Sequence, residues 1–135
     1  MKTILKSITL SVLVVFAVSC KKDEGTLPDI KLKTGTGYIS EDATLPAGTS
    51  VKIGIEADKT EDKDVLKKFD ISESVNGADA TSIFNMDLDA SEEDHFEYDY
   101  TTTVDTISGQ TNKYIFTITN RDGLVNHAFL TLTVQ

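Results

Sequence analysis

The residues best suited to chemistry are acidic, and they are concentrated in one stretch in the second half of the chain. No Lys or Arg occurs from Asp87 through Asn112, whereas eight carboxylates do: Asp87, Asp89, Glu92, Glu93, Asp94, Glu97, Asp99 and Asp105. Carboxylate oxygens gathered in a loop between two strands are the ligands that Ca²⁺ prefers. A calcium site is therefore the first hypothesis to weigh against a solvated acidic loop.

The spacing of these carboxylates favours the solvated loop. The segment Asp87-x-Asp89-x-Ser91 begins as an EF-hand loop does, but Glu92 stands where that loop requires Gly, and Tyr98 where it requires a bidentate Glu. We therefore expect no bound metal and no cofactor. A calcium site of another kind would use Asp87, Asp89, Glu92 and Asp94. A second acidic loop, residues 58–64, alternates in sign, and we expect it to compensate its own charges.

Catalysis finds little support in the residue pattern. His95 and His127 are the only imidazoles, and the chain has no nucleophile elbow, no metalloprotease helix motif and no phosphate-binding glycine loop. We therefore expect no enzymatic activity. His127 has the same strand parity as Phe129 and is expected on the outer face of its sheet.

Aromatic residues raise the separate hypothesis of sugar binding, because their rings can stack on sugar faces. Tyr98 and Tyr100 share one strand face with Phe96, which predicts core packing rather than stacking on a ligand. Tyr38 lies beside an irregular first strand and is the ring with the best prospect of exposure. The chain has no Trp, which further weakens the sugar-binding hypothesis.

Length and charge restrict the classes of partner and fold. The chain has 135 residues, with 22 acidic and 13 basic side chains and a formal net charge of -9, which repels nucleic acid and anionic membrane surfaces. One Cys cannot close an internal disulfide, and with two His it leaves too few ligands for a structural zinc site. We expect one monomeric domain that is stabilised by its apolar core.

The elements that must position these groups are strands. Period-two alternation recurs along the chain, whereas no helical stripe appears beyond residue 28. Asn76-Gly77 and Arg121-Asp122-Gly123 are turn sequences, and the second predicts a hairpin that closes the chain. A first strand, interrupted at Gly35 and Gly37, is expected to be kinked and to lie at a sheet edge. The count is about seven strands over residues 29–135, which is typical of a two-sheet β-sandwich.

The N-terminus carries a secretion signal. Lys2 and Lys6 precede an apolar run from Ile8 to Val18, whose roughly 11 residues are about half of what a membrane-spanning helix needs. Ala17-Val18-Ser19-Cys20 resembles a bacterial lipobox, which implies cleavage of residues 1–19 and acylation of Cys20 with chains such as palmitate. Lys22, Asp23 and Glu24 resemble the surface-export signal of Bacteroidetes lipoproteins. Residues 20–28 are expected to form a flexible tether.

The stretch from Gly37 to Val134 resembles the immunoglobulin-like domains, related to polycystic-kidney-disease-type repeats, of small Bacteroidetes lipoproteins. Tyr114-Ile115-Phe116 matches the Tyr-x-Cys of strand F with Phe in place of Cys, and Phe69 takes the place of the strand C Trp. The resemblance implies an all-β immunoglobulin-like sandwich at the outer membrane surface, acting as a binding or structural module for a surface protein or glycan. The alternatives are an accessory protein of a polysaccharide-uptake system and a calcium-dependent adhesion module.

Overall fold

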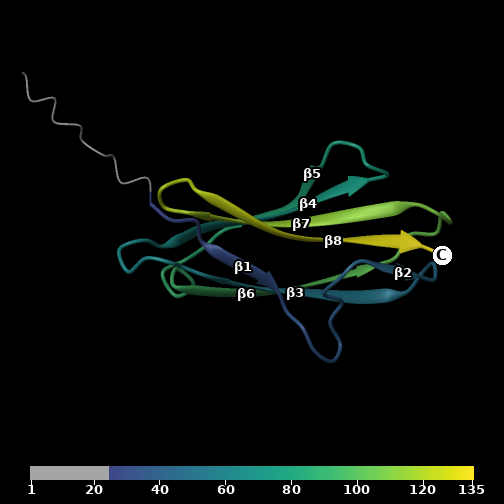
Figure 1. The fold of residues 1–135 in the computed structure, drawn as a ribbon, viewed down its shortest axis with the longest axis horizontal. Coiled ribbons are helices and arrows are strands. Elements are labelled where there is room, and N and C mark those ends of the chain that lie inside the picture. The colour runs from purple at the N-terminus through teal and green to yellow at the C-terminus, as the bar shows by residue number, and fades with distance from the viewer. Residues whose placement is uncertain (1–24) are drawn as a thin grey trace, which may run out of the picture.

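The computed structural model describes residues 25–135, which form eight strands and no helix (Figure 1). The all-β fold class predicted from the alternating pattern is confirmed. The strands are β1 (Asp29–Leu32), β2 (Ala43–Leu45), β3 (Ser50–Asp58), β4 (Leu66–Val75), β5 (Thr81–Asp87), β6 (His95–Thr103), β7 (Thr111–Asn120) and β8 (Val125–Val134).

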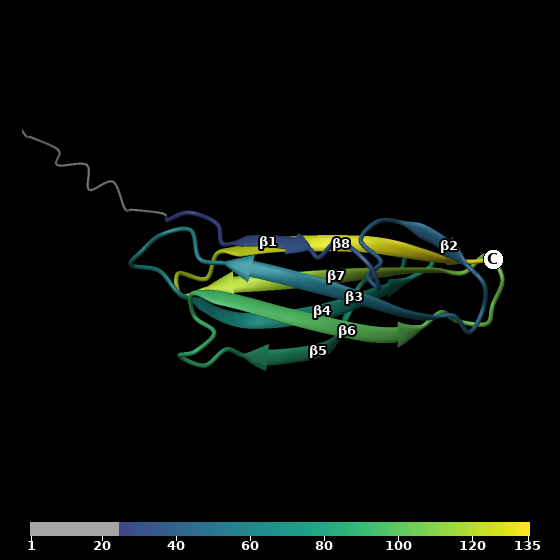
Figure 2. The same cartoon turned by 90° about the horizontal axis from the view of Figure 1, so that it is seen from below.

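The strands form two sheets that face each other across the core (Figure 1), and Figure 2 views the two sheets face-on. One sheet has three strands in the order β1-β3-β6, and the other has five in the order β2-β8-β7-β4-β5. All neighbouring strands are antiparallel except β2 and β8, which run parallel, with Ala43 opposite Leu132. The expected kinked first strand is two short edge strands in different sheets. The additional strand relative to the expected seven is β2, whose three residues are too few for alternation to reveal.

The predicted turns have the backbone geometry that their sequences require. Asn76 and Gly77, which follow β4, have φ values of 51° and 77°, and a positive φ at both positions is the condition for a tight turn of this kind. Gly123 between β7 and β8 has a φ of 82°. The closing hairpin is confirmed, because β7 pairs with β8 in antiparallel register, and the turn at Asn76-Gly77 leads from β4 to its antiparallel neighbour β5.

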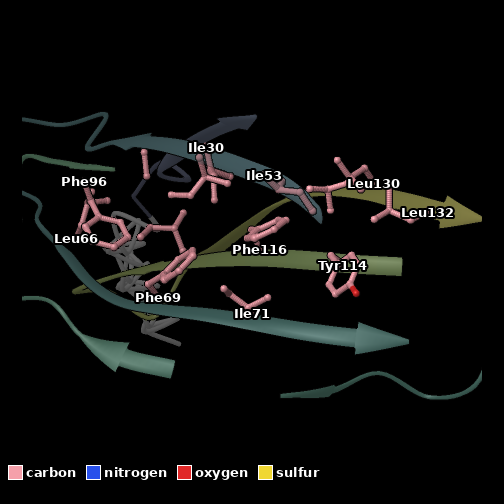
Figure 3. Packing of buried hydrophobic residues seen from close by; sticks show 14 of the residues in the cluster. Ile30, Ile53, Leu66, Phe69, Ile71, Phe96, Tyr114, Phe116, Leu130 and Leu132 are labelled. Atoms are coloured by element: carbon pink, nitrogen blue, oxygen red, sulfur yellow. The ribbon is translucent and has the colours of Figure 1, made fainter. Parts of the chain in front are cut away.

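The core is centred on aromatic rings from both sheets (Figure 3). Phe69 on β4 is 1% exposed, and its ring centroid lies 5.1 Å from that of Phe96 and 6.4 Å from that of Phe116. Tyr98 and Tyr100 pack against the same cluster, as strand parity predicted. Burying a large apolar side chain contributes about 1.5–3 kcal/mol, so this cluster is the main source of stability. The fully buried aliphatic residues around it include Ile53, Ile55, Leu66, Ile71, Ile118 and Leu130.

The folded domain begins earlier than the sequence suggested. Pro28 is fully buried, and its carbonyl accepts a 2.9 Å hydrogen bond from the Asn126 side chain. The Thr26 carbonyl accepts a hydrogen bond from the Asn120 side chain at 3.2 Å. Residues 26–28, expected in the tether, are therefore held against the sandwich, because the side-chain amides of Asn120 and Asn126 bind the carbonyl groups of Thr26 and Pro28. Within residues 25–135, no helix is long and apolar enough to cross a membrane.

Candidate functional site on the outer face of the three-stranded sheet

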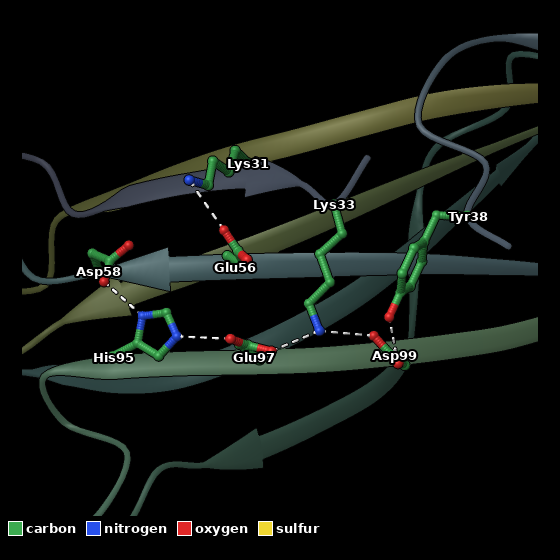
Figure 4. Close-up of polar contacts among 8 residues, drawn as sticks. All are labelled: Lys31, Lys33, Tyr38, Glu56, Asp58, His95, Glu97 and Asp99. Atoms are coloured by element: carbon green, nitrogen blue, oxygen red, sulfur yellow. Dashed lines mark hydrogen bonds and ion pairs between the residues drawn. The ribbon is translucent and has the colours of Figure 1, made fainter. Parts of the chain in front are cut away.

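Charged side chains cover the outer face of the β1-β3-β6 sheet (Figure 4). Alternation places every second residue of each strand on this face and the others in the core. The register sets Glu56 opposite Lys31 on one side and opposite Glu97 on the other. We call this surface the charged face; it comprises Lys31, Lys33, Tyr38, Lys52, Glu56, Asp58, His95, Glu97 and Asp99.

Gly54 lets two side chains lie against the middle of the charged face. A Cβ at this position would come within 2.6 Å of Tyr38 Cε1 and 2.7 Å of Lys33 Cδ, so only Gly fits. The Lys33 amide donates to the Gly54 carbonyl at 2.8 Å, which extends the β1 pairing by one residue. The glycine thus fixes the positions of both side chains over the sheet.

Lys33 bridges two carboxylates of β6. Its Nζ lies 2.8 Å from Glu97 Oε2 and 3.0 Å from Asp99 Oδ1, and the Lys33 side chain is only 14% exposed. Hydrogen bonds from Lys33 and then from His95 lower the pKa of Glu97 to about 2. The same ammonium group is the main cause of the lowered pKa of Asp99, to which the Tyr38 hydroxyl also donates at 3.0 Å. The pKa of Lys33 is raised in turn, chiefly by its hydrogen bond to Glu97.

His95 connects β6 to β3 at the other end of this network. Its Nδ1 lies 2.6 Å from Asp58 Oδ1, and its Nε2 lies 3.0 Å from Glu97 Oε1. Hydrogen bonds to Glu97 and then to Asp58 raise the pKa of His95, because both favour the charged imidazolium. Both ring nitrogens are therefore occupied by carboxylates.

A shallow hollow of about 480 Å³ lies beside Lys33. Lys31 and Glu56 form one side of it and make an ion pair at 3.0 Å, while Tyr38 forms another. The Lys52 and Lys33 ammonium groups lie 4.7 and 5.7 Å from the centroid of the Tyr38 ring. The hollow offers charged donors and acceptors to a polar ligand, whereas stacking on the Tyr38 ring competes with these cation-π contacts.

The carboxylates of the proposed calcium loop have other partners. Asp89 Oδ1 accepts from the Ser91 hydroxyl at 2.5 Å and from the Ser91 amide at 2.8 Å, and these two bonds, the first above all, lower the pKa of Asp89. Glu92 Oε2 accepts from the Asp89 amide at 3.1 Å. Asp94 pairs with Lys59 at 2.7 Å, whereas Asp87 ends β5 as an exposed residue. Among residues 25–135, no group of three or more acidic, His or Cys side chains is placed to hold a metal ion.

The expectation that the loop of residues 58–64 compensates its own charges is wrong. Asp58 bonds to His95 and Lys59 pairs with Asp94, so both pair with the segment at the start of β6. Asp64 is 2% exposed and is satisfied by the Val65 amide and by the Asn120 side chain. Asp58 and Lys59 find partners at the start of β6 because β3 and β6 are antiparallel neighbours, so the end of β3 lies beside the start of β6.

The remaining candidates lie elsewhere. Cys20, Lys22, Asp23 and Glu24 fall outside the described residues, as do residues 1–19. His127 is on the outer face of the five-stranded sheet, as expected, where its Nδ1 lies 2.8 Å from the Thr117 hydroxyl. Sequence reasoning missed Lys33. The signal that could have revealed it is Gly54, because a glycine inside an alternating strand commonly marks a close approach by another group.

No protein-family model and no curated relative matches this sequence. Among solved structures, a superoxide reductase (neelaredoxin) from Ignicoccus hospitalis is similar with a TM-score of 0.54 and 8% identity, over 81% of this chain and 80% of that one. The CARDB domain of a Pyrococcus furiosus protein gives a TM-score of 0.46 and 12% identity, over 81% and 98% of the two chains. Identities this low bear on the fold alone.

The strand order defines the class of the domain. The β1-β3-β6 sheet corresponds to strands A, B and E of an immunoglobulin fold, and β8-β7-β4 corresponds to G, F and C, with β5 added beside C. Tyr114 and Phe116 lie on the strand F equivalent and Phe69 on the strand C equivalent. The domain is an immunoglobulin-like β-sandwich, a fold that supports many unrelated functions.

Proposed function

We propose that this protein is a lipid-anchored lipoprotein of the Bacteroidetes type, exposed at the outer membrane surface, whose immunoglobulin-like domain is a non-enzymatic binding module. Acylated Cys20 would hold the chain on the membrane, and Lys22, Asp23 and Glu24 would direct it to the cell surface. The domain acts as a monomer on a surface protein or glycan. The net charge of the full sequence, -9, disfavours nucleic acid as a partner.

The observation that carries the anchoring proposal is the agreement of four sequence features. Two lysines precede an apolar run, small residues follow it, and the only Cys of the chain comes next at position 20. The domain geometry is compatible with this anchor. The first described residues are bonded to the β7-β8 end of the sandwich, and Gln135 lies at the opposite end (Figure 1).

The binding role is supported by the fixed arrangement of side chains on the charged face. Lys33, Tyr38 and Asp99 are held in one arrangement by contacts with one another and by the absence of a side chain at Gly54. Preorganised polar groups lose little freedom when they bind a partner. His95 has both ring nitrogens bonded to carboxylates, which suits it to joining strands rather than to taking a proton from a nucleophile.

Fatty-acid labelling of the full chain in a bacterium that processes lipoproteins tests the anchor. The native chain should incorporate labelled palmitate, and Cys20→Ala should lose the label and leave the membrane fraction or remain unprocessed. Ser19→Ala keeps a small residue before the cleavage point and should be labelled as the native chain is. Label and membrane association that persist in Cys20→Ala would refute the proposal.

A further inference from the structure

The edge of β6 differs from the other sheet edges among residues 25–135. β6 is nine residues long and pairs with β3 at every position without a register shift. β1 and β2 have only four and three residues, and the pairing of β5 with β4 contains a bulge. Short strands, bulges and charged side chains protect a sheet edge against another chain. β6 is long and has no bulge, and the carboxylates of Glu97 and Asp99 oppose acidic strands but not basic ones.

The backbone groups at this free edge can be assigned. The Lys59 amide donates to Asp94 O at 3.1 Å, and the Val104 amide donates to Thr49 O at 2.8 Å. Hydrogen-bonded and non-bonded pairs alternate along an antiparallel ladder, so the even-numbered residues of β6 bond to β3. The N–H and C=O groups of Glu97, Asp99 and Thr101 therefore point away from β3, toward the free edge.

The side chains on the two faces beside the β6 edge differ: carboxylates lie on the outer face and aromatic rings on the inner face. On the outer face, the Glu97 and Asp99 side chains remain 48% and 40% exposed. On the inner face, the half-buried rings of Tyr98 and of Phe84 on β5 stack at 5.1 Å, and Figure 2 shows β5 and β6 along the same side of the sandwich. Side chains of an added strand would alternate between these carboxylates and these rings.

We propose that the free edge of β6 binds an extended, cationic segment of a partner protein as an added antiparallel strand. The proposal deepens the binding role proposed above and rests on it. Main-chain hydrogen bonds provide the attachment, and alternating basic and apolar side chains provide the specificity. Lys33, Lys59 and Lys67 pair with four of the eight carboxylates between residues 87 and 105. The other four, Asp87, Asp89, Glu92 and Asp105, leave this edge and its flanking loops with an excess of negative charge that attracts a basic segment. A second copy is disfavoured, because both copies carry a net negative charge: the full sequence has 22 acidic and 13 basic side chains, and cleavage of residues 1–19 removes Lys2 and Lys6.

The test uses residues 25–135, which contain the whole described core from Ile30 to Val134. The probe is a capped, fluorescent nine-residue peptide of alternating valine and lysine, and its binding is followed by anisotropy. A valine-glutamate peptide of the same pattern is the charge control. Thr101→Pro removes one edge N–H without removing a bond to β3, because Pro is tolerated on an edge strand. Thr101→Ala keeps that N–H and is the matched control variant.

We expect the valine-lysine peptide to bind the native domain and Thr101→Ala alike, and Thr101→Pro about tenfold more weakly, since a hydrogen bond is lost and the ring blocks the edge. Amide exchange measured by NMR gives a second readout that needs no variant. The Glu97, Asp99 and Thr101 amides should exchange fast in the free domain and slow down when the peptide binds.

Equal affinity of Thr101→Pro and Thr101→Ala, or of the two peptides, would overturn the proposal. So would bound peptide that leaves these three amides unprotected. Dimers in sedimentation, with the same amides protected before any peptide is added, would assign the edge to a second copy instead. None of these results affects the fatty-acid labelling of Cys20, so failure of the edge proposal and failure of the anchor are distinguishable.

Discussion

Gly54 lies directly beneath the ring of Tyr38: a Cβ on Gly54 would approach Tyr38 Cε1 to 2.6 Å. The Tyr38 hydroxyl reaches over β3 to Asp99 on β6, so the ring spans a strand to which it does not belong (Figure 4). The loop that follows β1 is thereby attached to β6 through a side chain. The attachment requires that the intervening strand have no side chain at that point.

Gly54→Ala should destabilise the domain by about 1–3 kcal/mol, because the added methyl group displaces Tyr38 and Lys33. Urea denaturation of the native and variant domains measures this cost. In the double variant Gly54→Ala/Tyr38→Ala the clash with the ring is absent. The double variant should therefore lose less unfolding free energy than the two single variants lose in total. Strict additivity would mean that Tyr38 does not rest on Gly54.

Asn120→Ala should cost about 1–3 kcal/mol, because it removes the side-chain donor to Oδ2 of the buried Asp64 carboxylate and leaves only the Val65 amide, which donates to Oδ1. The same change removes the bond to Thr26 O. Asn126→Ala removes the bond to Pro28 O and the acceptor of the His127 amide but touches no buried carboxylate, so it is the control and should cost less. Thermal unfolding of the three proteins ranks the effects, and an equal cost for both variants would contradict the role given to Asp64.

Truncation of a core side chain on either β7 or β8 should lower the free energy of unfolding. Phe116 and Leu132 are 0% and 2% exposed, and replacing either by Ala should cost about 2–5 kcal/mol through lost burial and a residual cavity. Phe129 on the same hairpin is 58% exposed, and its replacement by Ala should cost about 1 kcal/mol or less. Denaturant titration that gave the three variants similar costs would contradict the strand phase.

The His95 network predicts a loss of stability as the pH rises. The folded pKa of His95 lies above its ordinary value of 6.5, so its contribution is fully present below pH 6.5 and is lost as the pH rises through the folded pKa. His95→Gln keeps hydrogen-bonding groups without titrating, and its stability should vary less with pH in this window. His127→Gln removes an imidazole from the other sheet, leaves the His95 network intact and is the matched control variant. An NMR titration that found an unraised pKa for His95 would remove the basis of the prediction.

Calcium should stabilise the domain no more than sodium chloride of the same ionic strength does, because Asp89, Glu92 and Asp94 already have partners within the protein. Melting temperatures in EDTA, in millimolar CaCl₂ and in NaCl of matched ionic strength test this. A specific site would add about 2.7 kcal/mol at a calcium concentration one hundred times the dissociation constant. A higher melting temperature in calcium alone would favour the adhesion-module alternative.

The predictions that held depend on local patterns. Alternation placed Phe96, Tyr98 and Tyr100 in the core, because a strand repeats every two residues whatever it pairs with. Asn76-Gly77 indicated its turn, because few other residues adopt a positive φ without strain. Both features can be recognised without knowing the strand order.

The charged face could not be predicted in the same way. Lys33 meets Glu97 and Asp99 only because β1 and β6 lie on opposite sides of β3, and that order is a property of the whole fold. The pairing of Lys59 with Asp94 likewise depends on the register of β3 with β6. Charges that appear uncompensated along the sequence are paired across strands.

Thr26 is bonded to Asn120 at the β7-β8 turn, and the C-terminal Gln135 lies at the opposite end of the sandwich (Figure 1), which has a mechanical consequence. Tension between them pulls β1 along its pairing with β3, and pulls β8 along its pairings with β7 and β2. These hydrogen bonds are loaded lengthwise and together, so the strands must slide as units instead of opening one bond at a time. Resistance to such a load is set by the unfolding rate rather than by the equilibrium stability. A domain built this way can transmit force along its long axis while its sheets stay folded.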